Sequence, residues 1–286
     1  MKIREKSLVF NETFIGVWNI IINMMMMAIY VKFMEGIAGL TAAMMGVAIL
    51  SIVLGVIAFF VLEKPKKSLE TEEKTNIIQD FILVGRKKAT WLVAILVFSI
   101  YSFLTTLTYF TPYFTDVLGV TIVFTGWVAI LRQHGMTLLG APIGGILSDI
   151  LKSPSKVLLG VQALGILGFI MLLTVHTMTA PILIALTLIL SAAVYIGRGA
   201  YYATITEAGI PRELTASTIG IAAAIGFSPD LFQFTLFGYW LDVYGKTAYT
   251  YMFIFQTVVL VIGFFAAIGI LRLRKQNHET VQAIAE

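Results

Sequence analysis

The chain has 286 residues, of which 58% are hydrophobic and only 13% are charged, whereas charged residues make up about 25% of an ordinary soluble domain. So few charges cannot cover the surface of a water-soluble globule, and the composition therefore indicates an integral membrane protein. The formal net charge of +4 is small, and nucleic acid is not an expected partner. The absence of cysteine excludes a disulfide framework, a thiolate metal site and a cysteine nucleophile.

Eight apolar stretches are long enough to cross a bilayer, because a helix needs about 20 residues to span a hydrocarbon core of about 30 Å. We therefore predict an all-α integral membrane protein with eight transmembrane helices in the lipid bilayer. The first stretch is a spanning helix rather than a cleaved export signal, since no small-residue cleavage site follows a short apolar core. The predicted spans are Phe14–Val31, Gly36–Leu62, Trp91–Phe114, Thr121–Leu147, Val157–Val175, Pro181–Thr204, Thr215–Leu241 and Tyr249–Leu271.

The first span carries two amide side chains, Asn19 and Asn23, one helical turn apart. Polar side chains on one helical face either line a cavity that binds solute or form hydrogen bonds between helices. We include Asn23 among the candidate solute-binding residues. The four consecutive methionines from Met24 to Met27 point all round the helix, which favours packing over a metal site.

A polar segment separates the first two spans from the last six, and it divides the chain into four parts. These are two helices in residues 1–63, a central loop at 64–89, six helices in 90–275 and a tail at 276–286. Within the loop, Ile77, Ile78, Phe81 and Ile82 share one side of a helix. We expect a short amphipathic helix on the membrane surface. It either couples two halves of a transporter or belongs to a solvated linker.

The Lys and Arg residues predict the orientation of the chain. Sixteen of the 20 fall on the same side of the predicted spans as the two termini and the central loop, and only Lys32 and Lys246 fall on the other side. Basic residues collect on the cytoplasmic side of membrane proteins. This asymmetry predicts cytoplasmic termini, a cytoplasmic central loop and a multi-pass protein of the plasma (inner) membrane.

The third span has one polar face, which includes Ser102, Thr105, Thr106 and Tyr109. Such a face is expected to point away from lipid. It either lines a cavity that binds a hydroxylated solute or forms hydrogen bonds between helices. On the first interpretation, Ser102, Thr105 and Tyr109 are candidate substrate-binding residues.

The remaining two basic residues, Arg132 and Arg198, lie inside the fourth and sixth spans. Arg132 is 16 residues before Ser148, which places it roughly 24 Å along its helix and deep in the hydrocarbon. A buried arginine is expected to face a protein interior or a watery cavity, and often marks a functional site. We assign Arg132, the adjacent Gln133 and Arg198 to the solute site, although Arg198 could instead extend its guanidinium toward the membrane surface.

Asp230 in the seventh span is the one carboxylate that we expect to be buried, at a depth that matches Arg132. A carboxylate that exchanges an arginine partner for a proton can couple transport to an ion gradient. The alternatives are a permanent pair with arginine or a bond to the backbone near Pro229. The Ser228-Pro229 pair also predicts a kink, because proline removes a backbone donor.

No nucleotide-binding, hydrolase or metalloprotease motif occurs in the sequence, so we do not expect an enzyme, a cofactor or a bound metal. Glycines recur at packing intervals instead, as in Gly140-Ala141-Pro142-Ile143-Gly144-Gly145. Small residues at this spacing predict close contact between helices.

The junction of the fourth and fifth spans reads Gly144-Gly145-Ile146-Leu147-Ser148-Asp149, followed by Lys152 and Lys156. It resembles the Gly-x-Leu-Ala/Ser-Asp loop signature of the major facilitator superfamily, although Ile150 replaces the usual basic residue. Two helices, a central loop and six helices also resemble helices five to twelve of that fold. Segments 198–203 and 210–242 are similar to a bacterial branch of the family with sugar-derived or organic-anion substrates.

The resemblance implies secondary active transport, with a small-molecule solute bound at mid-membrane between two six-helix halves that move against each other. It makes Asp149 a cytoplasmic gate residue. Two buried arginines against one buried aspartate favour an anionic solute, with a proton or sodium as the coupling ion. Helices one to four are missing from this layout. Either an N-terminal four-helix segment supplies them, or the chain is a non-transporting membrane protein such as a truncated remnant, an assembly partner or a sensor.

Overall fold

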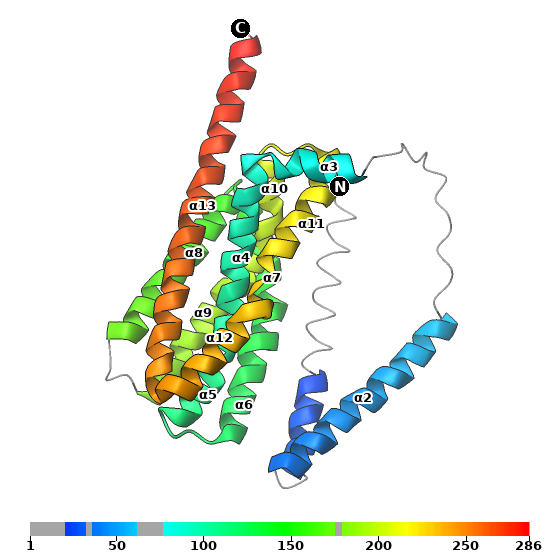
Figure 1. Ribbon diagram of the computed structural model, residues 1–286, viewed down its shortest axis with the longest axis vertical. Coiled ribbons are helices and arrows are strands. Elements are labelled where there is room, and N and C mark those ends of the chain that lie inside the picture. The colour runs from blue at the N-terminus through cyan, green and yellow to red at the C-terminus, as the bar shows by residue number, and fades with distance from the viewer. Residues whose placement is uncertain (1–20, 33–35, 62–76, 175–178, 286) are drawn as a thin grey trace.

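The computed structural model describes residues 21–32, 36–61, 77–174 and 179–285. Within these ranges all regular structure is helical (Figure 1), which confirms the predicted all-α membrane fold. Five described segments are long and apolar enough to cross a membrane: Ile37–Ile57, Lys88–Asp116, Pro154–Thr174, Ala180–Glu207 and Arg212–Asn277. The last of these makes two passes, because the chain runs along α11 and α12 to one end of the bundle and returns along α13 (Figure 1).

The elements follow one another in a simple order. A helix over Ile21–Lys32 comes first, and the first residues of the span predicted for Phe14–Val31 lie outside the described part of the chain. The later helices are α2 (Gly36–Val61), α3 (Ile77–Gly85), α4 (Lys88–Thr108), α5 (Phe110–Asp116), α6 (Ile122–Ile130), α7 (Met136–Ile150), α8 (Pro154–Thr174), α9 (Ala180–Ala200), α10 (Thr204–Glu207), α11 (Thr215–Gly226), α12 (Pro229–Tyr244) and α13 (Ala248–Ala285). Four short elements join them: the π-helix η1 (Leu131–Gly135) and the 3-10 turns η2 (Tyr201–Ala203), η3 (Arg212–Leu214) and η4 (Gly245–Thr247).

Two local predictions from the sequence are confirmed. A short helix, α3, forms within the predicted central loop. The seventh span is interrupted where Ser228-Pro229 predicted a kink, since α11 ends at Gly226 and α12 begins at Pro229. Proline suits this position because the first residue of a helix does not need its amide hydrogen.

Helix α4 lies at the centre of the bundle and supplies much of its buried core. Aromatic rings join α4 and the following helix α5 to their neighbours: the Phe103 and Phe169 centroids are 5.3 Å apart, and those of Phe110 and Phe253 are 5.5 Å apart. These phenylalanines come from α4, α5, α8 and α13 and lie in one continuous cluster. Packing in this part of the bundle therefore rests on apolar side chains from helices that are distant in the sequence.

Helices α7 and α9 pack through glycine, as the spacing of the glycines predicted. A Cβ atom added to Gly144 would lie 2.1 Å from the carbonyl oxygen of Ile196, and one added to Gly199 would lie 2.2 Å from that of Ala141. Such distances leave no space for any larger residue. The two backbones can approach this closely only because both positions lack a side chain.

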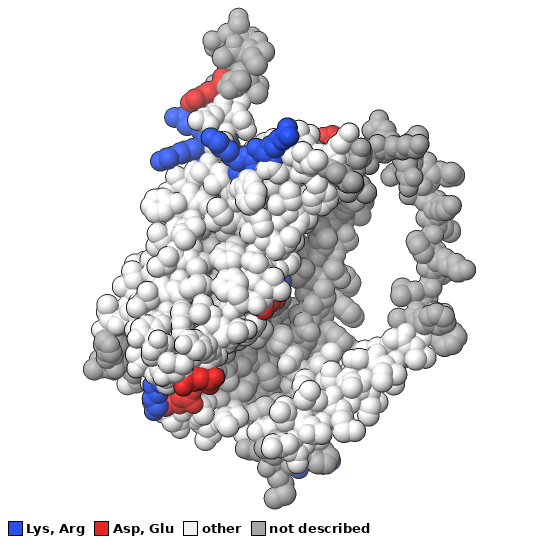
Figure 2. Space-filling model, in the orientation of Figure 1, with Lys and Arg blue, Asp and Glu red and all other residues white. Residues whose placement is uncertain are grey.

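Helix α2 stands apart from the bundle and contributes almost no buried side chains (Figure 1). Its apolar residues, such as Ile37 and Ile52, are largely exposed. Charged side chains show the opposite pattern, because they gather at the two ends of the bundle and leave its long side almost uncharged (Figure 2). This distribution is typical of a protein whose long side faces lipid.

Candidate functional site

Arg132 lies in the π-helix η1 and is only 2% exposed. One guanidinium nitrogen donates to the Thr111 hydroxyl at 3.0 Å, while Nη1 has no hydrogen-bond partner among the described residues. The guanidinium also lies 5.9 Å from the centre of the Phe110 ring. A buried cation with a free donor is costly unless an anion or a polar ligand completes its shell.

The π-helix itself is a local departure from regular structure that helps to set the direction of Arg132. The wider turn places Leu131 to Gly135 between α6 and α7, and the Ser191 hydroxyl of α9 donates to the carbonyl oxygen of Arg132. Single π turns occur often at functional sites. This turn could not be predicted from the sequence, because its residues also fit an α-helix.

Tyr195 of α9 connects Arg132 with Arg198. Tyr195 and Arg132 line the same small cavity of about 10 Å³, together with Leu104, Leu107, Thr108, Gln133 and Ser191. Arg198 is half-buried, and its guanidinium lies 5.7 Å from the centre of the Tyr195 ring. The charge of Arg198 also lies within electrostatic range of Tyr101 on α4. Arg132 and Arg198 therefore both lie beside Tyr195.

The expectation that Asp230 is buried is wrong for the described chain. Asp230 lies in the first turn of α12 and is exposed, and its carboxylate accepts a 2.7 Å hydrogen bond from the Tyr101 hydroxyl. Among the described residues it forms no ion pair with an arginine. The position of a residue along a helix does not determine which side of the helix it occupies, and Asp230 lies on the exposed side of α12.

The polar face of α4 is engaged in contacts between helices. The hydroxyls of Ser102 and Thr106 donate to Gln256 of α13 at 2.9 and 2.8 Å, and Gln233 of α12 donates to Thr106 at 2.8 Å. All four side chains are fully buried. The amide atoms Oε1 of Gln233 and Nε2 of Gln256 have no hydrogen-bond partner in the described ranges, so the network retains one free acceptor group and one free donor group.

Two other candidates on the third span point in different directions. The Thr105 hydroxyl is buried and donates to the Tyr101 carbonyl of its own helix at 3.1 Å. Tyr109, between α4 and α5, is half-buried and donates to the carbonyl oxygen of Phe234 at 3.2 Å. Among the candidates Ser102, Thr105 and Tyr109, only Tyr109 is partly accessible. Like the neighbouring Tyr101, it forms a hydrogen bond with α12.

Asn23 and Gln133 lie at a second cavity of about 260 Å³, between the helix of residues 21–32, α2 and α6. Gln133 also lines the small cavity next to Arg132. Gln133 therefore borders both cavities, one beside Asn23 and the other beside Arg132. Tyr30 and His134 complete the polar part of the lining.

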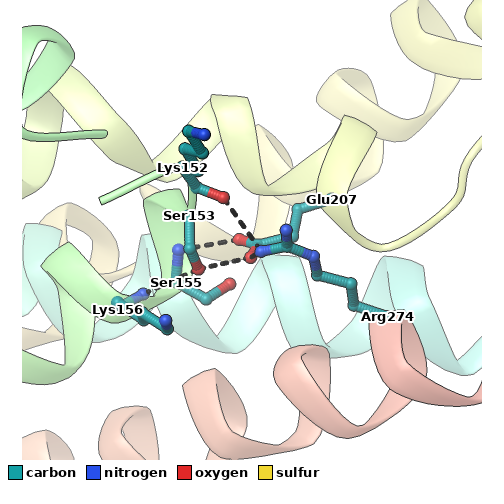
Figure 3. A network of polar contacts seen from close by, with 6 residues as sticks. All are labelled: Lys152, Ser153, Ser155, Lys156, Glu207 and Arg274. Carbon is teal, nitrogen blue, oxygen red and sulfur yellow. Dashed lines mark hydrogen bonds and ion pairs between the residues drawn. The ribbon is translucent and has the colours of Figure 1, made fainter. Parts of the chain in front are cut away.

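A separate polar network closes the end of the bundle where α10 ends (Figure 3). The Glu207 carboxylate accepts hydrogen bonds from the Ser153 hydroxyl at 2.5 Å, the Ser155 amide at 2.8 Å and Arg274 Nη1 at 2.9 Å. Arg274 also donates to the carbonyl oxygen of Lys152 at 2.9 Å. Glu207 thus caps the start of α8 and links it to α13.

Asp149, the expected gate residue, is exposed at the rim of this network. It shares a cavity of about 530 Å³ with Ser148, Lys152, Glu207 and Arg274. Among the described residues it forms no ion pair, and Glu207 pairs with Arg274 instead. Glu207 was not among the residues predicted from the sequence, because it follows a span, where a carboxylate is usually a solvated charge.

Three buried glutamines were also missed. Gln162 donates to the Ser99 hydroxyl at 2.5 Å, and Gln233 and Gln256 join α12 and α13 to α4. Their only sequence signal is an uncharged amide within an apolar helix, which is weaker than a buried charge. Within the described ranges, no group of three His, Asp or Glu side chains is arranged to hold a metal ion.

Comparison with known proteins adds three findings. The sequence profile of the Major Facilitator Superfamily matches residues 8–232. The chain is 30% identical over 241 residues to the Inner membrane protein YihN of Escherichia coli K12, and the matched region covers 82% of this chain and 57% of YihN. It is also 30% identical over 202 residues to the Inner membrane protein YqcE of the same organism, covering 68% of this chain and 48% of YqcE. The chain thus spans about half the length of these relatives, and no solved structure matches it.

Proposed function

The chain belongs to the major facilitator superfamily, and we propose that it forms part of a secondary transporter for a small anionic solute. The proposed transporter carries a sugar-derived or organic acid by alternating access in the inner membrane, the location named for both E. coli relatives. One observation supports the anionic assignment: Arg132 is almost fully buried, and one of its guanidinium nitrogens has no partner within the described part of the chain.

Arg132 binds the anion in this proposal. Its guanidinium already uses one nitrogen for Thr111, so the free Nη1 can donate to a carboxylate or phosphate oxygen. Arg198 adds a second positive charge next to Tyr195. The cavity beside Arg132 and Tyr195 measures only about 10 Å³, so solute entry requires the neighbouring helices to separate, as alternating access provides.

The other predicted residues have supporting roles in the proposal. Tyr109 and Gln133 contact the uncharged part of the solute, and Asn23 reaches it across the cavity that it shares with Gln133. Ser102 and Thr105 are buried in helix contacts and reach the solute only in another conformation. The accessible side chains are thus assigned direct contact with the solute, and the buried ones are not.

Asp230 provides the coupling to a proton or sodium gradient. Its carboxylate is exposed and accepts a hydrogen bond from Tyr101, which lies within electrostatic range of Arg198. The tyrosine can thereby transmit a change in the charge of Asp230 to the arginine side of the site. A neutral or ion-bound Asp230 would accept a weaker hydrogen bond from Tyr101.

A further part of the protein completes the transporter in this proposal. Residues 1–63 form the last two helices of the first half, 64–89 the central loop and 90–275 the six helices of the second half, with residues 276–286 as a tail. The exposed apolar side of α2 would pack against four additional helices, and the exposed carboxylate of Asp230 would face them across the solute pathway. Both termini lie in the cytoplasm, and Asp149 contacts the other half as a gate residue.

Binding of small anions to the purified protein tests the proposal. The native protein, tagged after Glu286, is heated with gluconate, glucuronate or succinate, and with glucose as a neutral comparison. A bound anion raises the unfolding midpoint by mass action. We expect stabilisation by at least one anion, loss of this effect in Arg132→Ala and retention in Arg212→Ala, whose arginine is exposed. Stabilisation that survives Arg132→Ala would remove Arg132 from the site.

A further inference from the structure

Helix α3 lies across the end of the bundle rather than along it (Figure 1). It is held there by specific contacts. Val84 is fully buried, and the Phe81 ring covers Gly220 of α11 so closely that an added Cβ would lie 3.0 Å from it. The Trp91 indole of α4 donates to the carbonyl oxygen of Gly85 at 2.8 Å. The helix is therefore a fixed part of the bundle end.

The outer side of this end is apolar. Phe81, Ile82 and Leu83 are each between 41 and 52% exposed, and Trp91 is 51% exposed. Contiguous exposed apolar side chains indicate a surface that another molecule covers. A tryptophan at the start of a spanning helix is typical of the membrane interface, where its ring meets lipid headgroups.

Three basic residues in succession, Arg86, Lys87 and Lys88, lie between the apolar residues of α3 and Trp91. Arg86 and Lys88 are exposed, and within the described part of the chain none of the three forms an ion pair. From Ile77 to Trp91 the single acidic residue is Asp80. The surface therefore has an excess of positive charge directly beside its apolar residues.

We propose that α3, Arg86–Lys88 and Trp91 form a binding surface for an anionic phospholipid. Phe81, Ile82 and Leu83 contact the upper part of the acyl chains, and the basic residues bind the headgroup phosphate. Short amphipathic helices bind membranes by this combination of apolar area and basic charge. Each basic residue near an anionic surface contributes a preference of about fivefold at room temperature, so charge complementarity selects an anionic lipid over a zwitterionic one.

The test uses a chain that contains no cysteine, so Ile82→Cys provides a single site for a bimane fluorophore. The labelled protein is placed in phosphatidylcholine vesicles that contain an equal fraction of either brominated phosphatidylglycerol or brominated phosphatidylcholine. Ile189→Cys is the matched control, because Ile189 is 51% exposed against 52% for Ile82 and lies in the middle of α9. The measured quantity is the ratio of quenching by the two brominated lipids.

We expect phosphatidylglycerol to quench the label at residue 82 several-fold more strongly, and both lipids to quench equally at residue 189. Replacing the three basic residues together by Gln, or raising the salt concentration, should bring the ratio at residue 82 close to one. Lys246→Gln should leave it unchanged. Equal quenching at residue 82, or a ratio that survives the triple replacement, would overturn the proposal. So would an absence of quenching by either lipid, because α3 would then be covered by protein.

Discussion

At the residue scale, the chain places very few charges inside its apolar body, and each has a distinct environment. Arg132 is enclosed and lacks one partner, Arg198 stacks on Tyr195, and Asp230 faces outward with Tyr101 as its donor. A charge of one sign without a nearby counter-ion favours a ligand of the other sign. The proposed anion site follows from that imbalance around Arg132.

The proposed coupling role of Asp230 gives a prediction about energy sources. Asp230→Asn cannot gain and lose a proton, so uptake driven by an imposed proton gradient should be lost in vesicles. Exchange of solute at equal pH should continue, because the anion contacts Arg132. Asp242→Asn, an exposed carboxylate change on the same helix α12, is the control and should leave uptake intact. Gradient-driven uptake that persists in Asp230→Asn would exclude this role.

A second residue prediction concerns the Glu207 network. The side chain of Glu207 is 4% exposed and accepts three hydrogen bonds. The side chain of Arg274 is one-third exposed, so water screens the contribution of its ion pair with Glu207 to stability. Glu207→Gln should therefore lower the free energy of unfolding by roughly 1 to 2 kcal/mol. The measurement is denaturation in detergent, with Glu213→Gln as the exposed control. Equal effects of the two changes would show that the network adds nothing to stability.

The sequence predicted the burial of Arg132 correctly, but it did not predict which side of its helix Asp230 occupies. The enclosed position of Arg132 was expected from its distance to the end of the span, and that distance depends only on helix length. The exposure of Asp230 was not expected, because rotation of α12 about its axis depends on packing against α4. The glutamine contacts were missed for the same reason: partners such as Gln256 and Ser102 are 154 residues apart.

At the element scale, α7 and α9 depend on glycine for their contact, and neighbouring glycines give a matched test. A Cβ at Gly144 would meet the Ile196 carbonyl, whereas a Cβ at Gly145 meets nothing within 4 Å. Overpacking costs about 1–3 kcal/mol, so Gly144→Ala should lower the unfolding midpoint by roughly 2–10 °C. Gly145→Ala should be neutral or slightly stabilising, because alanine favours a helix. Equal midpoints for the two variants would contradict this packing.

Elements with a periodic or residue-specific signal were predicted correctly from the sequence. The short helix α3 and the break at Pro229 follow from apolar spacing and from the missing amide hydrogen of proline. The π turn around Arg132 could not be predicted, since its residues also fit an α-helix and its backbone contact with Ser191 comes from a helix distant in the sequence. Local propensity does not include such a tertiary contact.

At the scale of the whole molecule, the apolar exterior and the charged ends describe a membrane bundle (Figure 2). Hydropathy predicts this level of organisation well, because each span must satisfy its backbone hydrogen bonds within the lipid. The chain spans about half the length of its E. coli relatives, and the exposed side of α2 is available to further helices. The proposed transporter is therefore a larger assembly with this chain as its Arg132-containing part.

Uptake by cells that express the protein at its native length tests the central claim most directly. Radiolabelled gluconate, glucuronate, succinate, glucose and glycerol are supplied separately to cells with the wild type, Arg132→Ala or Arg212→Ala. We predict that at least one anion and neither neutral solute accumulates, that Arg132→Ala abolishes this uptake and that Arg212→Ala preserves it, with equal amounts of protein in the membrane. Accumulation of a neutral solute, or of an anion at an unchanged rate in Arg132→Ala, would contradict the account.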